Sequence, residues 1–149
     1  MDAIDRKIVR MLQQDARASL QQIGQAVGLS SSPCWERIRK LEQGGVIEGY
    51  TVRLNAPALG LHDTVLVQLT LDSHTDNTLE QFGEMLAAIP EVVEAYLVSG
   101  DYDYLLRVAV KDTRDYERLL RERLYKIKGI RHSKSSFVLR TLKKADLPI

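Results

Sequence analysis

Residues 28–45 have the sequence GLSSSPCWERIRKLEQGG, and this stretch predicts one helix with a marked beginning and end. Gly28 suits the left-handed conformation in which a preceding helix would end. Pro33 is tolerated only in the first turn of a helix, so the helix begins close to it and is capped by one of the three serines before it. The glycines at 44–45 end the helix. Its apolar positions recur at helical spacing and are expected to be buried: Cys34, Ile38 and Leu41.

Two further helices are predicted on the N-terminal side of this stretch. The first has Asp2 as its candidate N-cap, and its apolar face consists of Ile4, Ile8, Met11 and Leu12. The pattern breaks at 15–17. The second is predicted at 19–27 with Ser19 as its N-cap, and its apolar face consists of Leu20, Ile23 and Val27. A short helix, a turn with glycine and a longer helix, preceded by a supporting helix, form a helix-turn-helix.

The residues after 45 have the alternation typical of strands. A strand is predicted at 46–54, within a linker that we place at 46–60. Further strands are predicted at 64–71, 92–98, 104–110 and 130–142, with helices around 79–89 and 116–124. The order β-α-β-β-α-β is the ferredoxin-like pattern. The predicted fold class is therefore α+β, with domain boundaries at 1–45, 46–60 and 61–149.

Composition and charge restrict the class of protein. The net charge is +1, and residues 1–60 carry eight Lys/Arg against six Asp/Glu, so any DNA binding must depend on local placement of cations. The chain shows no signal sequence and no apolar run of about 20 residues, so we expect no membrane partner. A single cysteine, Cys34, fits a reducing compartment, and the expected location is the cytoplasm. Two small domains favour a homo-oligomer.

The outer face of the helix within 28–45 carries the side chains suited to DNA. Opposite the apolar stripe lie Glu36, Arg39, Lys40 and Gln43, with Trp35 and Arg37 on the two flanks. Cationic and amide side chains bind phosphates and base edges. The serines at the helix start, Ser30, Ser31 and Ser32, offer hydroxyl and backbone N–H groups to a phosphate. The alternative is an ordinary amphipathic helix with a solvated face.

Together these residues make the sequence similar to a known family. The N-terminal motif comprises Ile4-Asp5, Gly28-Leu29-Ser30, Ser32-Pro33-Cys34, Arg37, Leu41-Glu42, Val46-Ile47 and Tyr50. A second motif comprises SGDYDYLL at 99–106 and SSFVL at 135–139. Both motifs, in this order, resemble the feast/famine regulators of the Lrp/AsnC family, and the resemblance covers essentially the whole chain.

The resemblance implies a winged-helix-like N-terminal domain and a C-terminal effector domain of the RAM type. It implies homodimers formed through the sheet domain and the linker strand, octamers of four dimers, and an amino acid bound where dimers meet. The DNA-facing positions carried over are Ser32, Arg37 and Lys40, with Arg39 and Trp35 beside them. The effector positions carried over are the turn Gly100, Asp101, Tyr102 and Asp103 and the strand residues Ser135 and Ser136.

The chemistry of the turn supports an amino acid ligand independently of the resemblance. Gly100 allows close approach of the backbone, so neighbouring N–H groups can hold a carboxylate. Asp101 or Asp103 can accept hydrogen bonds from the ammonium group, and the two serines can donate or accept. The alternative is a plain hairpin turn, in which a glycine followed by an aspartate is common.

Other functions find less support in the sequence. The three histidines have no metal-ligand spacing to one another or to Cys34, and neither a GxSxG motif nor a phosphate loop occurs, so we expect no enzyme, no metal and no cofactor besides the effector. A transcription regulator whose assembly and DNA binding respond to an amino acid is the favoured interpretation. The alternative is an architectural, chromatin-like DNA-binding protein without an effector.

Overall fold

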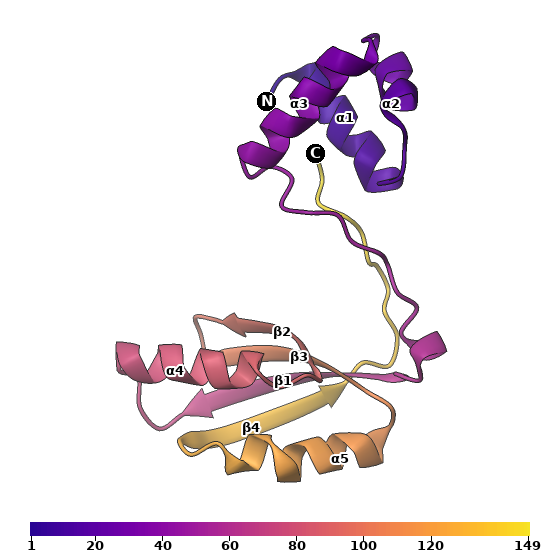
Figure 1. The fold of residues 1–149 in the computed structure, drawn as a ribbon. Helices are drawn as coiled ribbons and strands as arrows, with labels where there is room; N and C mark the ends of the chain where they lie inside the picture. Colours follow the sequence, from indigo (N-terminus) through magenta and orange to yellow (C-terminus); the bar gives the residue numbers. More distant parts are fainter. The chain divides into compact units, whose positions relative to one another are not determined.

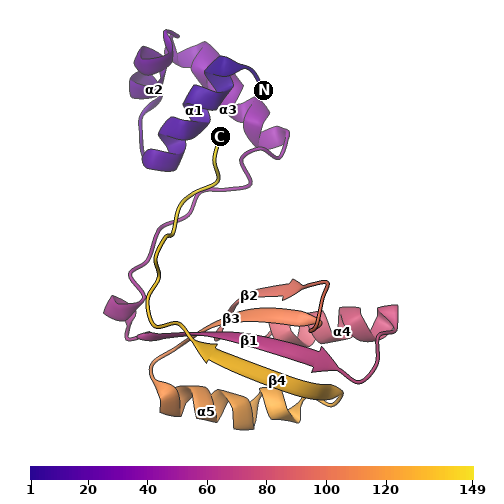
Figure 2. The same ribbon diagram turned by 180° about the vertical axis from the view of Figure 1, so that it is seen from behind.

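The chain folds into two compact units. The computed structural model describes residues 1–149 except for the side chain of residue 76. The first unit comprises Met1–Leu54 together with Lys143–Ile149, and the second comprises Asn55–Leu142 (Figures 1 and 2).

Three helices make up most of the first unit: α1 (Ala3–Gln14), α2 (Leu20–Val27) and α3 (Ser31–Gln43). Asp2 and Ser19 cap α1 and α2, and each belongs to a reciprocal capping box with the residue three positions later. Gly28 ends α2 with φ of 74°, as the sequence predicted. Ser30 is the N-cap of α3, which settles which of the three serines begins that helix.

The core of the first unit seats α3 on the other two helices. Ile8 of α1, Ile23 of α2 and Cys34 of α3 are at most 1% exposed. Ile38 and Leu41 complete the predicted stripe on α3 and are also buried. Burying a side chain of this size contributes about 1.5–3 kcal/mol. The helix-turn-helix prediction is confirmed, and so is the buried stripe of α3; on α1 the structure also buries Val9, which the sequence analysis does not include.

The strand predicted at 46–54 is not formed. The backbone N–H groups of Val46 and Ile47 both donate to the Leu41 carbonyl, which closes a turn after α3, and coil follows up to the short 3-10 helix η1 (Pro57–Leu59). The alternating apolar side chains Val52 and Leu54 are 74% and 67% exposed. A strand needs a hydrogen-bonding neighbour, and the described residues of this single chain supply none to this segment.

The second unit is the predicted ferredoxin-like domain. Its elements are β1 (Asp63–Leu71), α4 (Asp76–Ala87), β2 (Val92–Leu97), β3 (Tyr104–Val110), α5 (Thr113–Glu122), the 3-10 helix η2 (Leu124–Lys126) and β4 (Ile130–Phe137). The sheet order is β2-β3-β1-β4, and all neighbours are antiparallel. The last strand is shorter than the predicted 130–142, because β1 pairs with it only as far as Phe137.

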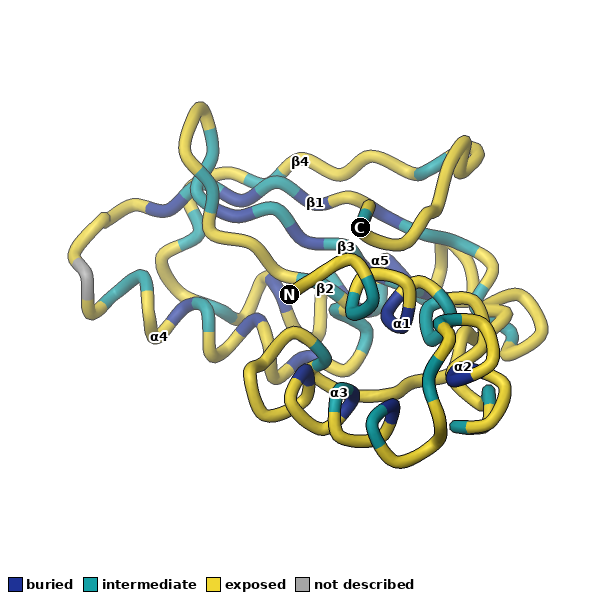
Figure 3. The backbone as a smooth tube through the Cα atoms, turned by 90° about the horizontal axis from the view of Figure 1, so that it is seen from above, coloured by how far each residue is buried: buried dark blue, intermediate teal, exposed yellow. Residues whose placement is uncertain are grey.

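Alternation along the strands divides this sheet into two faces. On β1, Val65, Val67 and Leu69 are fully buried against α4 and α5, together with the alternate residues of β3 (Figure 3). The opposite face carries Leu66 on β1 and Leu105 on β3, which lie diagonal to each other, since Leu66 aligns with Arg107 and Leu105 aligns with Gln68. None of the described helices of the second unit packs on this opposite face, which is therefore open in the single chain.

The C-terminal segment returns to the helical unit. Arg10 Nε donates to the carbonyl oxygen of Ile149 at 2.8 Å, and Gln13 Nε2 donates to that of Leu147 at 3.1 Å. The half-buried Ile149 side chain packs against the core of the three helices. The sequence pattern assigns residues 61–149 to one domain, whereas these contacts join 143–149 to the first unit.

Gly24→Ala should destabilise the first unit. A Cβ at Gly24 would lie 2.5 Å from the carbonyl oxygen of Leu29, a backbone atom that already follows a tight turn. We expect the free energy of unfolding to fall by about 1–3 kcal/mol, although alanine is intrinsically the better helix former. Urea unfolding followed by circular dichroism measures the change. Gly49→Ala is the matched control, since nothing lies within 4 Å of its Cβ position, and equal stability of the two variants would refute the steric argument.

Candidate DNA-binding and effector-binding sites

The outer face of α3 presents most of the predicted DNA-binding residues to solvent. Ser32, Arg39 and Lys40 are exposed, and so is Trp35 on the flank. The Arg39 guanidinium lies 5.3 Å from the centroid of the Trp35 ring, a cation–π contact of about 0.5–1 kcal/mol at an exposed site. Trp35 therefore favours one position of Arg39 along the helix surface.

The N-terminal turn of α3 has unpaired donors. The Ser30 hydroxyl makes no capping hydrogen bond, and Ser31 and Ser32 are the first two residues of the helix. Backbone N–H groups at these positions have no carbonyl partner within the helix, and the positive end of the helix dipole lies there. Pro33, the third residue, has no N–H to offer. This turn can accept an anionic oxygen such as that of a phosphate.

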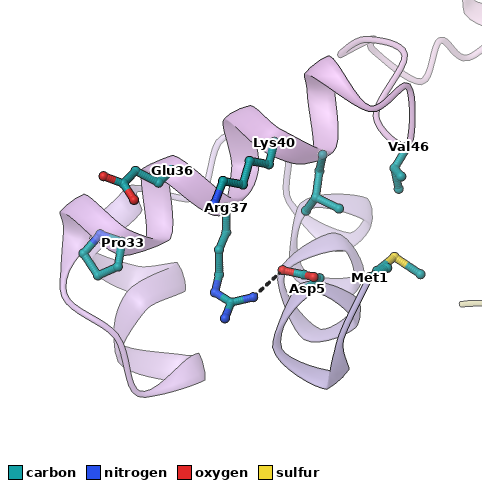
Figure 4. A pocket seen from close by; sticks show the side chains of 8 residues that line it. Met1, Asp5, Pro33, Glu36, Arg37, Lys40 and Val46 are labelled. Carbon is teal, nitrogen blue, oxygen red and sulfur yellow. Dashed lines mark hydrogen bonds and ion pairs between the residues drawn. The ribbon is translucent and has the colours of Figure 1, made fainter.

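Arg37 occupies a different position from the other predicted DNA-binding residues. Its Nη1 donates to Asp2 Oδ2 at 2.6 Å and to Asp5 Oδ1 at 2.7 Å, and Figure 4 shows the side chain directed at Asp5 at the start of α1. The pKa of the Asp2 carboxyl lies below its usual range because it accepts a hydrogen bond from the Asp5 backbone N–H and a second from Arg37. Sequence spacing gave no sign of these partners, which are more than 30 residues away.

A shallow pocket of about 520 Å³ lies between the start of α1 and α3 (Figure 4). Its charged lining residues are of both signs: Asp5, Glu36, Arg37 and Lys40. Because two of these four residues are acidic, the pocket lacks the uniformly positive lining that a bound phosphate would favour.

Asp103 is held in place by the second unit. Its Oδ2 accepts from the backbone N–H of Leu71 at 2.7 Å, and its Oδ1 lies 2.9 Å from Nε2 of His74. The Asp103 backbone N–H donates to the Leu69 carbonyl, and the Asp103 carbonyl accepts from the Val98 N–H. The sequence had suggested Asp103 as an acceptor for an ammonium group, and it did not identify His74, which is 29 residues away.

The turn before Asp103 is open. Gly100 has φ of 127°, a conformation that favours glycine, and a Cβ there would meet no atom within 4 Å. Asp101 is exposed and Tyr102 is half-buried. The space around Gly100 is therefore open, and ligand binding at this turn stays a prediction.

Ser135 and Ser136 point to opposite faces of the sheet. Ser135 aligns with the buried Val67, and its Oγ lies 2.5 Å from the hydroxyl of Tyr116 on α5. Ser136 aligns with Leu66 and shares the open face. Both serines lie two strands away from the 100–103 turn, on the order of 10 Å by the spacing of strands. A single chain therefore does not gather the predicted effector residues into one site.

Among the residues that the structure describes, His, Cys, Asp and Glu side chains form no group of three suited to a metal ion. No described helix combines the length and apolar character needed to cross a membrane.

A helix-turn-helix unit joined to a ferredoxin-like unit defines a two-domain class of regulatory protein. Residues 1–42 match the AsnC-type helix-turn-helix domain, and residues 64–148 match the Lrp/AsnC ligand binding domain. This chain belongs to the Lrp/AsnC family, as its two motifs had indicated. It is 39% identical over 146 residues to the leucine-responsive regulatory protein of Escherichia coli strain K12, covering 98% of this chain and 89% of that one.

Solved structures agree in fold over nearly the whole chain. An AsnC family transcriptional regulator from Agrobacterium tumefaciens is 40% identical with a TM-score of 0.94, covering 99% of this chain and 97% of its own. A transcriptional regulator from Neisseria meningitidis in complex with L-methionine is 28% identical with a TM-score of 0.93, covering 99% and 96%. A feast or famine regulatory protein from M. tuberculosis, also complexed with L-methionine, is 34% identical with a TM-score of 0.88, covering 99% and 98%. These relatives are transcriptional regulators and not enzymes, in agreement with the sequence prediction.

The Arg37 ion pairs should be visible in the titration of Asp2. Removing the guanidinium in Arg37→Gln should raise the Asp2 pKa toward its usual value, though not fully, because the Asp5 backbone N–H still favours the carboxylate. The pairs stabilise the fold above the usual range of an aspartate pKa, and this contribution disappears as pH falls through the lowered value. NMR titration of the carboxyl carbons measures the shift. Asp115, whose pKa is lowered by Arg118, is the internal control and should not move. An unchanged Asp2 pKa would contradict the contact.

Proposed function

We propose that this protein is a sequence-specific DNA-binding transcriptional regulator whose assembly and DNA binding respond to a small effector, an amino acid. The observation that carries the proposal is the orientation of α3. Its apolar stripe is buried, which leaves Ser32, Arg39 and Lys40 directed to solvent. The names of the relatives, including a leucine-responsive regulatory protein, support the same function.

The proposed DNA interface consists of α3 and the turn that begins it. A helix of this size fits the major groove of B-DNA, where Arg39 and Lys40 reach base edges or phosphates. Ser30, Ser31 and Ser32 contact the phosphate backbone, which fixes the register of the helix in the groove. Trp35 borders this surface and holds Arg39. A dimer would place two such helices in successive major grooves, about 34 Å apart.

The proposed assembly is a homodimer, and four dimers form an octamer. Two features of the single chain support self-association. The segment at 46–54 has exposed alternating apolar residues and no neighbouring strand among the described residues, so a second copy can pair with it as a strand. The open face of the sheet carries Leu66, Tyr96 and Leu105, which a partner sheet would cover.

The proposed effector site lies between chains and takes a free amino acid. Gly100 and its neighbours would supply backbone N–H groups to the carboxylate, and Asp103 or Asp101 would accept from the ammonium group. Tyr102, Ser135 and Ser136 complete the proposed set. Since these residues are spread over one chain, their contribution to a single site requires a second copy. The two relatives complexed with L-methionine support an amino acid as the ligand class.

The alternative is an architectural, chromatin-like DNA-binding protein without an effector. The open sheet face and the segment at 46–54 support self-association under either function. The two functions differ in their response to ligand. Under both, the protein acts on DNA, and we propose the cytoplasm as its location.

Lys40→Ala should lower the salt dependence of DNA binding. If Lys40 contacts a phosphate, its removal should reduce the slope of log K against log salt by about 0.9 per chain, or about 1.8 per dimer. Fluorescence anisotropy with a duplex selected by the wild-type protein from a random pool measures this slope. Lys126→Ala in the second unit is the control and should leave the slope unchanged. A Lys40→Ala slope equal to that of the wild type would remove Lys40 from the interface.

Asp103→Asn should weaken effector binding without loss of DNA binding. The first step is a thermal-shift screen with the twenty amino acids, because a ligand that binds only the folded protein raises the melting temperature. Replacing a charge-assisted hydrogen bond costs about 1.5–3 kcal/mol, which corresponds to a loss of about 10- to 150-fold in affinity for the amino acid that the screen identifies. Asp101→Asn is the matched comparison in the same turn.

Calorimetry of both variants decides which carboxylate binds the ammonium group. If both variants keep the wild-type affinity, neither aspartate belongs to the effector site. If no amino acid binds, the architectural alternative is favoured, and the DNA measurement above still stands.

A further inference from the structure

We propose that Arg37 is a positioning residue of the DNA-binding unit and not a DNA contact. It ties α3 to the N-terminal turn of α1 and so fixes the direction in which Arg39 and Lys40 point. This inference rests on the proposed function, because it concerns how the α3 surface is held for DNA.

The place of Arg37 on α3 argues for this role. It follows Cys34 by three residues and precedes Leu41 by four, so its side chain borders the buried stripe. Its side chain is 31% exposed, whereas Arg39 and Lys40 on the outer face are exposed to solvent. The guanidinium thus extends along the packing interface of α3 with α1.

The capping box of α1 leaves one oxygen of each carboxylate for Arg37. Asp2 Oδ1 accepts from the Asp5 backbone N–H, and Asp5 Oδ2 accepts from the Asp2 backbone N–H, both at 2.8 Å. The other two oxygens, Asp2 Oδ2 and Asp5 Oδ1, accept from Arg37 Nη1. All four carboxylate oxygens therefore serve one closed network, in which the capping box orients the two acceptors before α3 docks.

The charges around Arg37 argue against a contact between Arg37 and a DNA phosphate. The two carboxylates and the guanidinium together carry a net charge of −1. If Arg37 moved to a phosphate, it would leave two unpaired carboxylates beside the DNA surface, which repel the phosphates. A recognition helix must also be held within about 0.5 Å of its working position, and an ion-pair network at its flank meets that need.

The Asp2→Asn/Asp5→Asn double variant distinguishes the two roles of Arg37 by the sign of its effect. Asparagine is as good an N-cap as aspartate and keeps the capping acceptors, so the variant removes two negative charges and little else. If Arg37 contacted DNA, removing these charges would tighten binding. We expect the opposite: affinity for the selected duplex should fall about fivefold or more. The measurement is made well below the melting temperature, where a modest loss of stability leaves nearly all of the protein folded. Tighter binding by the variant would overturn the proposal.

Salt dependence gives a second readout. Arg37→Gln should weaken binding while the slope of log K against log salt stays at the wild-type value, and its effect should not add to that of Asp5→Asn in a double-mutant cycle. Lys40→Gln is the matched control on the same helix and should lower the slope. Should Arg37→Gln fail to fold by circular dichroism, Arg37→Lys replaces it, since lysine keeps the charge and one ion pair and should restore part of the affinity.

The outcomes for Arg37 and for the proposed function are separable. A lower slope for Arg37→Gln, or additive effects of Arg37→Gln and Asp5→Asn, would make Arg37 a DNA contact and leave the regulator function intact. A wild-type protein that selects no duplex from the random pool would overturn both.

Discussion

The packing of α3 against α1 and α2 through Cys34, Ile38 and Leu41 determines the direction of every other side chain on that helix. With 3.6 residues per turn, burying this stripe directs Arg39 and Lys40 to solvent and leaves Arg37 at the border. The α1 capping box meets Arg37 at that border. Local capping, core packing and surface charge in this unit thus follow from one buried stripe and are consistent with one another.

Local patterns predicted the helices and the topology of the sheet well. Capping residues such as Asp2 and Ser19 and the glycine at 28 act within a few residues, so sequence reveals them directly. Alternation predicted the ferredoxin-like order. It could also have shown that Ser135 and Ser136 face opposite sides of the sheet, because neighbouring residues on a strand always do.

Contacts between residues far apart in the chain could not be predicted from the sequence, for physical reasons. A strand is defined by its neighbour, so the alternating residues at 46–54 could not reveal whether one chain supplies a partner. The Asp103–His74 contact joins residues 29 positions apart and depends on the fold for its existence. The contacts of Arg10 and Gln13 with 147–149 involve backbone carbonyl oxygens, which every residue has and which leave no mark in the sequence.

Because 143–149 belongs to the same unit as the three helices, that unit is discontinuous in the chain. On the ribosome, the three helices emerge first, and about 105 further residues must be made before Ile149 can reach them. At about 5–20 residues per second this interval is roughly 5–20 s, far longer than a small helical unit needs to fold. The three helices therefore fold before Ile149 packs against their core. Residues 143–149 become available only after all strands of the sheet have been synthesised.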